Sequence, residues 1–129
     1  MARFTRHVVS VTTDASGDVT AYTTDPVNGY VHSIRYLPGS AALDTGADVD
    51  ITGEVTGIVV LNDDNIGTSA YTVMPRMATQ DETNTASLYA AAGEPVEDRV
   101  AIAGERIKVV VASGGDTKSG AFHIVVEGA

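Results

Sequence analysis

The histidines of this chain have the chemistry to support a functional site. The sequence contains three of them, His7, His32 and His123, and each falls on a different predicted strand. Because strands can converge in a folded sheet, three imidazoles could together hold a zinc ion. No closely spaced pair of ligands supports such a site. We therefore predict partly buried, hydrogen-bonded histidines and no bound metal.

Two acidic segments, residues 44–50 and 62–65, contain the oxygen ligands that calcium prefers. Neither segment fits the usual calcium-binding loop, which runs for roughly twelve residues and ends in a glutamate. Asp and Asn also favour turns, because their side chains accept hydrogen bonds from nearby backbone N–H groups. We predict that both segments are solvated turns.

Catalytic motifs are missing from the sequence. Gly114 and Gly115 lie between two predicted strands, without the Gly-Lys-Ser run that follows in a phosphate-binding loop. No serine stands in a nucleophile elbow, although a Ser–His–Asp arrangement across strands stays open. Glu94, Glu97 and Asp98 are better explained as loop and strand-edge charges than as an acid–base pair. The chain also lacks the cysteines of a thiolate site. We expect neither an enzyme nor a cofactor.

Arginines offer a different kind of chemistry. Arg35, Arg76, Arg99 and Arg106 stand beside aromatic or apolar residues in a chain with few lysines. A guanidinium pairs with carboxylates and stacks on aromatic rings, which enriches arginine at protein interfaces. Internal ion pairs within an acidic protein are the alternative. The interface residues that we predict are Arg3, Phe4, Arg6, Arg35, Tyr36 and Arg76.

The charge balance narrows the possible partners. Seventeen acidic and eight basic residues give a net charge of −9. Binding to a nucleic acid or to an anionic membrane needs clustered lysines and arginines, whereas the arginines here are scattered. The apolar runs are too short to span a bilayer, and the first residues lack the apolar segment of a secretion signal. We therefore expect no nucleic acid, no membrane and no secretion signal.

The elements that must position these residues are strands. A length of 129 residues fits a single β domain over residues 1–129. Short alternating segments between turn signals predict an all-β fold, an antiparallel β-sandwich or jelly-roll-like barrel of about eight or nine strands. The strands are expected at residues 3–13, 19–24, 30–37, 48–53, 58–61, 69–74, 98–103, 106–113 and 121–127.

Several of these strands carry further expectations. The first two are predicted to form a hairpin, and the continuous apolar run at residues 58–61 suggests a strand buried on both faces. The core is expected to contain alternating residues of the last two strands, namely Val109, Val111, Phe122, Ile124 and Val126.

Two segments depart from the strand pattern. Residues 86–92 (ASLYAAA), followed by Gly93, predict one short helical turn inside a long crossover loop at residues 76–97. Residues 1–6 allow two interpretations. They begin the first strand, or they form an N-terminal arm that carries Arg3, Phe4 and Arg6 to a neighbouring molecule.

Three blocks of the sequence support a resemblance, namely residues 30–37 (YVHSIRYL), 43–54 (LDTGADVDITGE) and 74–127. Together they resemble small proteins encoded among the structural genes of tailed bacteriophages. The likeness covers most of the chain but includes no catalytic motif. It implies a virion component, first a capsid decoration or cement protein and second a head–tail joining or small tail protein.

The resemblance also implies partners and a location. A decoration protein would self-associate as a homo-oligomer, bind the major capsid protein or other virion proteins, and lie on the capsid surface after assembly in the host cytoplasm. A module that binds carbohydrate or a host surface is a further alternative, but five Tyr, two Phe and no Trp provide few aromatic platforms. A hydrolase built on a β-scaffold is the third class.

Overall fold

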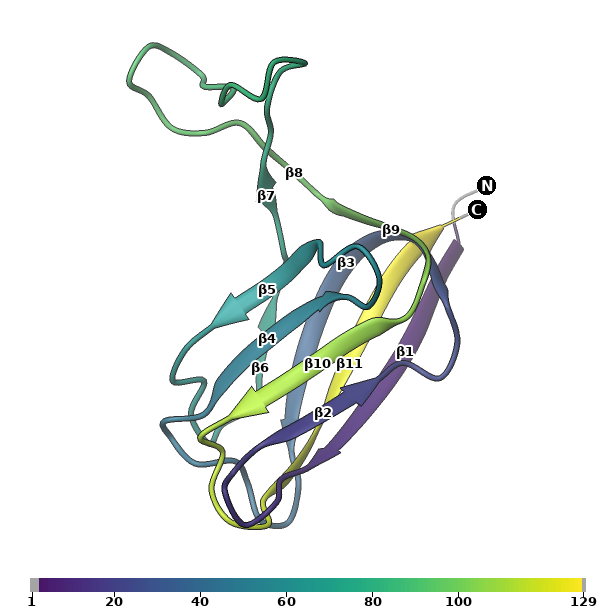
Figure 1. Ribbon diagram of the computed structural model, residues 1–129, viewed down its shortest axis with the longest axis vertical. Helices are drawn as coiled ribbons and strands as arrows, with labels where there is room; N and C mark the ends of the chain where they lie inside the picture. Colours follow the sequence, from purple (N-terminus) through teal and green to yellow (C-terminus); the bar gives the residue numbers. More distant parts are fainter. Residues whose placement is uncertain (1–2, 129) are drawn as a thin grey trace.

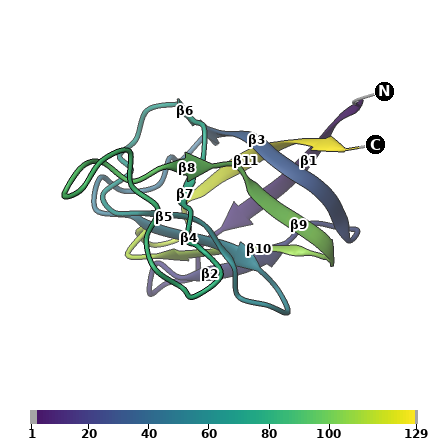
Figure 2. The same ribbon diagram turned by 90° about the horizontal axis from the view of Figure 1, so that it is seen from above.

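The computed structural model describes residues 3–128, in which two antiparallel sheets pack face to face and a third, two-stranded sheet lies apart from them. Figure 2 shows the two layers, with β1, β11 and β3 in one and β2, β10 and β4 in the other. Sheet A contains β1 (Arg3–Thr12), β11 (Ser119–Gly128), β3 (Val27–Pro38), β6 (Tyr71–Val73) and β9 (Val100–Glu105). Sheet B contains β2 (Val19–Tyr22), β10 (Ile107–Ala112), β4 (Asp48–Gly53) and β5 (Val59–Asp63). The predicted β-sandwich is confirmed.

The core lies between the sheets and follows the period of two expected for strands. Val109 and Val111 of β10 face Phe122, Ile124 and Val126 of β11, and all five are fully buried. Their neighbours in sequence alternate to the outer faces and are partly exposed. The core residues predicted from these two strands are therefore confirmed.

The predicted hairpin of the first two strands is wrong, because the strands lie in opposite sheets. β1 pairs with β11 over ten residues, from Arg3 opposite Gly128 to Thr12 opposite Ser119. β2 pairs with β10 instead. The hydroxyl of Thr13 donates a hydrogen bond of 2.6 Å to the carbonyl of Gly115, which fixes the point where the chain leaves sheet A.

The pairing of β1 with β11 decides between the two interpretations of residues 1–6. Residues 3–6 are paired with β11 along their whole length, as the first strand of a sheet requires. The structure therefore fits the first strand and not a free arm over these residues. Residues 1–2 lie outside the described residues.

β3 has two different partners along its outer edge. Its first half pairs with β9, up to Val31 opposite Val100, and its second half pairs with β6, from Ile34 opposite Val73. A β-bulge at His32 separates the two halves, because the register against β11 shifts there. β6 and β9 thus lie end to end along one strand, and residues 76–98 leave the sheet between them.

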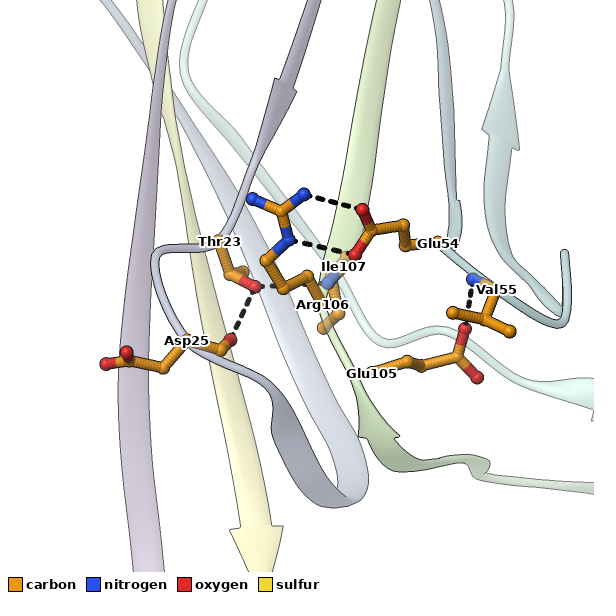
Figure 3. A network of polar contacts seen from close by, with 7 residues as sticks. All are labelled: Thr23, Asp25, Glu54, Val55, Glu105, Arg106 and Ile107. Carbon is orange, nitrogen blue, oxygen red and sulfur yellow. Dashed lines mark hydrogen bonds and ion pairs between the residues drawn. The ribbon is translucent and has the colours of Figure 1, made fainter.

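A polar network closes the end of the sandwich where the chain crosses from β9 to β10 (Figure 3). The buried carboxylate of Glu105 accepts hydrogen bonds from the backbone N–H of Val55 at 2.7 Å and of Thr56 at 3.0 Å. These bonds, with one from the Thr56 hydroxyl, lower the pKa of Glu105. On the other side, the buried Thr23 hydroxyl accepts from the Ile107 N–H at 3.1 Å. The network joins three strands of sheet B at their ends.

Candidate functional site

An arm, residues 76–98, stands off one end of the sandwich (Figure 1, upper left). Its base is a two-stranded ribbon of β7 (Met77–Ala78) and β8 (Glu97–Asp98), in which Met77 lies opposite Asp98. The buried apolar core includes no arm residue among the described residues. The arm therefore gains its shape from its own backbone hydrogen bonds and not from packing on the sandwich.

Ser87 divides the far end of the arm into two turns. Its N–H donates to the Thr79 carbonyl at 3.0 Å, and its carbonyl accepts from the Val96 N–H at 2.9 Å. The first turn, residues 81–85, is polar. The Asp81 carboxylate accepts from the N–H groups of Thr83 and Thr85, and these bonds lower its pKa. This turn presents charge and amide groups to solvent.

The second turn, residues 89–93, is apolar, and we call it the apolar turn. Tyr89 is 76% exposed, and three exposed alanines follow it. Its N–H donates to the Glu94 carbonyl at 3.1 Å, and the Gly93 N–H donates to the Ala90 carbonyl at 2.8 Å. The helical turn predicted at residues 86–92 is wrong, because Ala86 and Leu88 are held in β-bridges and only a single tight turn follows them.

A groove lies at the base of the arm, and we call it the root groove. Its volume is about 780 Å³, and its walls come from residues 58–62, residues 73–77 and Glu97. Val59 is 53% exposed and Met74 is 59% exposed, so apolar side chains reach solvent here. β5 pairs with β4 alone and is the last strand of sheet B. The prediction that residues 58–61 are buried on both faces is therefore wrong for this edge strand.

The predicted interface residues separate into three places. Phe4, Arg6 and Arg35 are exposed on the outer face of sheet A, where the rings of Phe4 and His32 lie nearly perpendicular with their centroids 5.6 Å apart. Arg3 is exposed at the end of β1. Arg76 lies in the root groove.

The prediction that Tyr36 is an interface residue is wrong. Its side chain is fully buried between the rings of Tyr71 and Phe122. The bulge at His32 inserts an extra residue, which turns Tyr36 inward on the same side as Val31. Burial raises the pKa of Tyr36, and it raises the pKa of Tyr71 to about 12.

Two other arginines, Arg99 and Arg106, form ion pairs within the protein, which was the alternative to an interface role. Arg99 pairs with Glu127 and covers the Tyr30 ring, and Arg106 pairs with Glu54. The second pair is bidentate, with hydrogen bonds of 2.8 Å and 2.5 Å (Figure 3), and it lowers the pKa of the Glu54 carboxyl. Both arginines therefore join elements of the sandwich to one another.

The three histidines do not share a site. His7 lies within hydrogen-bond distance of Thr5, His32 lies against Phe4, and His123 lies on β11 opposite Val8. Residues 3–128 contain no group of three His, Cys, Asp or Glu side chains arranged to hold a metal ion. They also contain no helix that could cross a membrane.

Of the interface residues predicted from the sequence, only Arg76 belongs to the root groove, and none belongs to the apolar turn. A signal for the arm is present in the sequence. Pro75 and Pro95 bracket a stretch that lacks the alternation of a packed strand, and within it the run Tyr89 to Ala92 is apolar. An apolar run that no period assigns to a core is a candidate for a surface contact.

Comparisons with known proteins give distant similarities. Neither a protein family nor a curated protein sequence matches this chain. The crystal structure of FLHE is similar at 13% identity and a TM-score of 0.46, over 98% of this chain and 96% of that one.

Two further solved structures are of viruses. A chain from the virus-like particle of the giant freshwater prawn Macrobrachium rosenbergii extra small virus is 12% identical, with a TM-score of 0.37 over 98% of this chain and 77% of that one. A chain of the Gx strain of infectious bursal disease virus is 15% identical, with a TM-score of 0.31 over 100% of this chain and 33% of that one. Similarities this distant carry no argument about function.

Proposed function

We propose that this chain is a non-enzymatic structural protein of a tailed-phage virion, a capsid decoration or cement protein that self-associates and binds the major capsid protein lattice. The observation that carries the proposal is the arm. It extends away from the sandwich, adds nothing to the core and ends in exposed apolar side chains. The virion context comes from the resemblance of the sequence to small phage structural proteins.

The energetic cost of an arm of this kind supports a role in assembly. Ordering a backbone segment in a folded protein costs roughly 1–2 kcal/mol for each residue, and the arm recovers little of this from apolar burial. Exposed apolar side chains gathered on a projection usually mark a contact with another protein. A virion supplies that contact many times over, since every copy meets neighbours on the lattice.

The sandwich provides the rigid support for such a contact. Its core is continuous between the two sheets, and ion pairs of Arg99 and Arg106 tie surface strands together. A carbohydrate-binding module is less favoured by this surface. The rings of Tyr22 and Tyr30 are covered by guanidinium groups, and the more exposed rings of Phe4 and Tyr89 lie apart, one on sheet A and one on the arm.

The test is the presence and copy number of the chain in purified particles of the phage that encodes it. Quantitative mass spectrometry should find the protein in numbers comparable to the major capsid protein. A count equal to one ring at the portal would favour the head–tail alternative and overturn the decoration role. Absence from the particles would overturn the virion proposal altogether.

A second measurement addresses the arm directly. A variant with residues 76–98 replaced by a short Gly-Ser linker should fold and yet fail to enter the particles. The matched control is Asn84→Gly on the polar turn, where the positive φ of 64° already suits glycine. The control should enter the particles as the wild type does. Equal incorporation of the armless variant would contradict the assembly role of the arm.

A further inference from the structure

We infer that the apolar turn of one copy docks into the root groove of a second copy of this chain. The inference rests on the proposed function, since it names the partner of the arm in self-association. Each copy carries one apolar turn and one root groove, so the contact can repeat from copy to copy. It closes as a reciprocal dimer or as a ring, depending on the rotation between neighbours.

The apolar turn has the composition of an anchor. Tyr89 offers a large ring that is 76% exposed, and aromatic side chains that fill a pocket dominate many protein interfaces. Ala92 adopts a left-handed backbone conformation, with φ of 57°, where a glycine would be unstrained. A methyl group held in a strained position at the tip of an exposed turn is explained if that methyl contacts a partner.

The root groove has the complementary character. Met74 and Met77 contribute flexible apolar side chains, and exposed methionines adapt their shape to the partner that covers them. Val59 adds a further apolar wall from β5. The groove is open to solvent, and its volume of about 780 Å³ is large enough to receive a tyrosine with neighbouring alanines.

The charges of the root groove and of the apolar turn favour a second copy of this chain as the occupant of the groove. Arg76 lines the groove, and its guanidinium donates a hydrogen bond of 2.8 Å to the carbonyl of Pro75. The ion pairs found within residues 3–128 involve Arg99 and Arg106, so Arg76 has no carboxylate partner there. Glu94, exposed at the end of the apolar turn, supplies that carboxylate when the turn enters the groove. Glu97, on the groove wall, keeps the site from becoming a general anion site.

The turn of a given copy is kept away from its own groove. The paired strands β7 and β8 form the base of the arm, and Thr79 continues the ladder with a bond of 2.8 Å from its N–H to the Val96 carbonyl. This ribbon carries the apolar turn outward from the sandwich (Figure 1). The groove and the turn therefore meet between molecules.

The experiment uses full-length protein and measures molar mass by size-exclusion chromatography with light scattering over a range of concentrations. The wild type should form a dimer or ring. Tyr89→Ser on the turn and Met74→Glu in the groove should each weaken self-association by about tenfold or more, as the loss of an anchor does. Val55→Ser is the matched control, since Val55 is 80% exposed but lies in neither element, and it should assemble as the wild type does.

Mixing the two variants provides the sharper test. The Tyr89→Ser copy retains its groove and the Met74→Glu copy retains its turn, so an equimolar mixture should form a one-to-one dimer that cannot grow further. Each variant should keep the melting temperature that the wild type has at a concentration where it is monomeric, because the altered side chains are exposed.

Three results would overturn the inference. These are a wild type that stays monomeric at every concentration, single variants that assemble like the wild type, and a mixture that stays monomeric. A monomeric wild type that still enters virus particles in high copy number would overturn the self-docking alone. The proposed virion function is tested separately by the composition of the particles.

Discussion

The guanidinium of Arg99 lies over the ring of Tyr30, with its central carbon 4.4 Å from the ring centre. Arg99 is the residue at which the arm returns to sheet A, immediately before β9, and it also pairs with Glu127 of β11. One side chain thereby ties the root of the arm to two strands of the sandwich.

Replacing Arg99 with alanine should lower the free energy of unfolding by about 1 kcal/mol. An exposed cation–π contact contributes roughly 0.5–1 kcal/mol, and a partly exposed ion pair contributes up to about 1 kcal/mol. Arg99→Lys should recover part of this loss, because it keeps the charge and loses the planar stacking. Chemical denaturation measures both. Arg6→Ala, on the outer face of the same sheet, serves as the control and should change stability by less than about 0.5 kcal/mol.

Ile124→Ala should destabilise the protein by about 2–5 kcal/mol, since Ile124 is fully buried in the middle of β11. Val8→Ala is the surface comparison, because Val8 is 45% exposed on the outer face of β1. Urea denaturation should leave the Val8 variant close to the wild type. A loss below about 0.5 kcal/mol for Ile124→Ala would place this face of β11 outside the core.

Gly120→Ala should destabilise the sandwich by about 1–3 kcal/mol, as overpacking a buried site does. A methyl group at this position would lie 2.7 Å from a carbon of the Tyr36 ring, which is itself held in the core. Gly46→Ala is the matched control, because the nearest atom to its added methyl is 3.9 Å away. Differential scanning calorimetry should separate the two. Equal melting temperatures for both variants would show that the Tyr36 ring has room to move.

Glu105→Gln should make the melting temperature less dependent on pH in the acid range. Hydrogen bonds from Thr56 and Val55 lower the pKa of Glu105 in the folded state below its ordinary value of 4.5. A lowered folded pKa means that the ionised group stabilises the fold above pH 4.5, and that this stability is lost as the pH falls through the folded pKa. The difference in melting temperature between wild type and variant should therefore be largest at neutral pH and shrink on acidification.

The control for this titration is Glu82→Gln, an exposed carboxylate on the polar turn of the arm. Its melting curve should follow that of the wild type at each pH. A wild type and a Glu105→Gln variant that lose stability in parallel would contradict the role of the Glu105 carboxylate.

Alternation in the sequence predicts which residues of a strand face inward but not which strand lies beside it. Val109 and Ile124 were assigned to the core correctly for this reason. The first two strands are adjacent in sequence and were expected to pair, yet β1 and β2 lie in different sheets. A turn that crosses between sheets and a turn that closes a hairpin have similar compositions, because Asp, Ser and Gly suit both.

The candidate site was harder to predict than the core. Tyr36 is predicted at an interface because it stands beside Arg35, but the register after the bulge at His32 turns its ring into the core, and nothing in the local sequence indicates this bulge. The arm has no apolar period, since it packs on nothing, and pattern reasoning assigned residues 76–97 to a loop. Arg76 was identified from its apolar neighbours, but the groove around it brings together residues of β5 and of the arm base that are distant in sequence.

The ladder between β1 and β11 has a consequence for how the protein is made. β1 must pair with β11, so sheet A cannot be completed until residues 119–128 have left the ribosome. β4 and β5 are neighbours in sequence and can pair much earlier. Pairing between distant segments slows folding. The side chains of Val9 and Val11, which are buried in the folded protein, stay exposed to solvent until β1 has paired with β11.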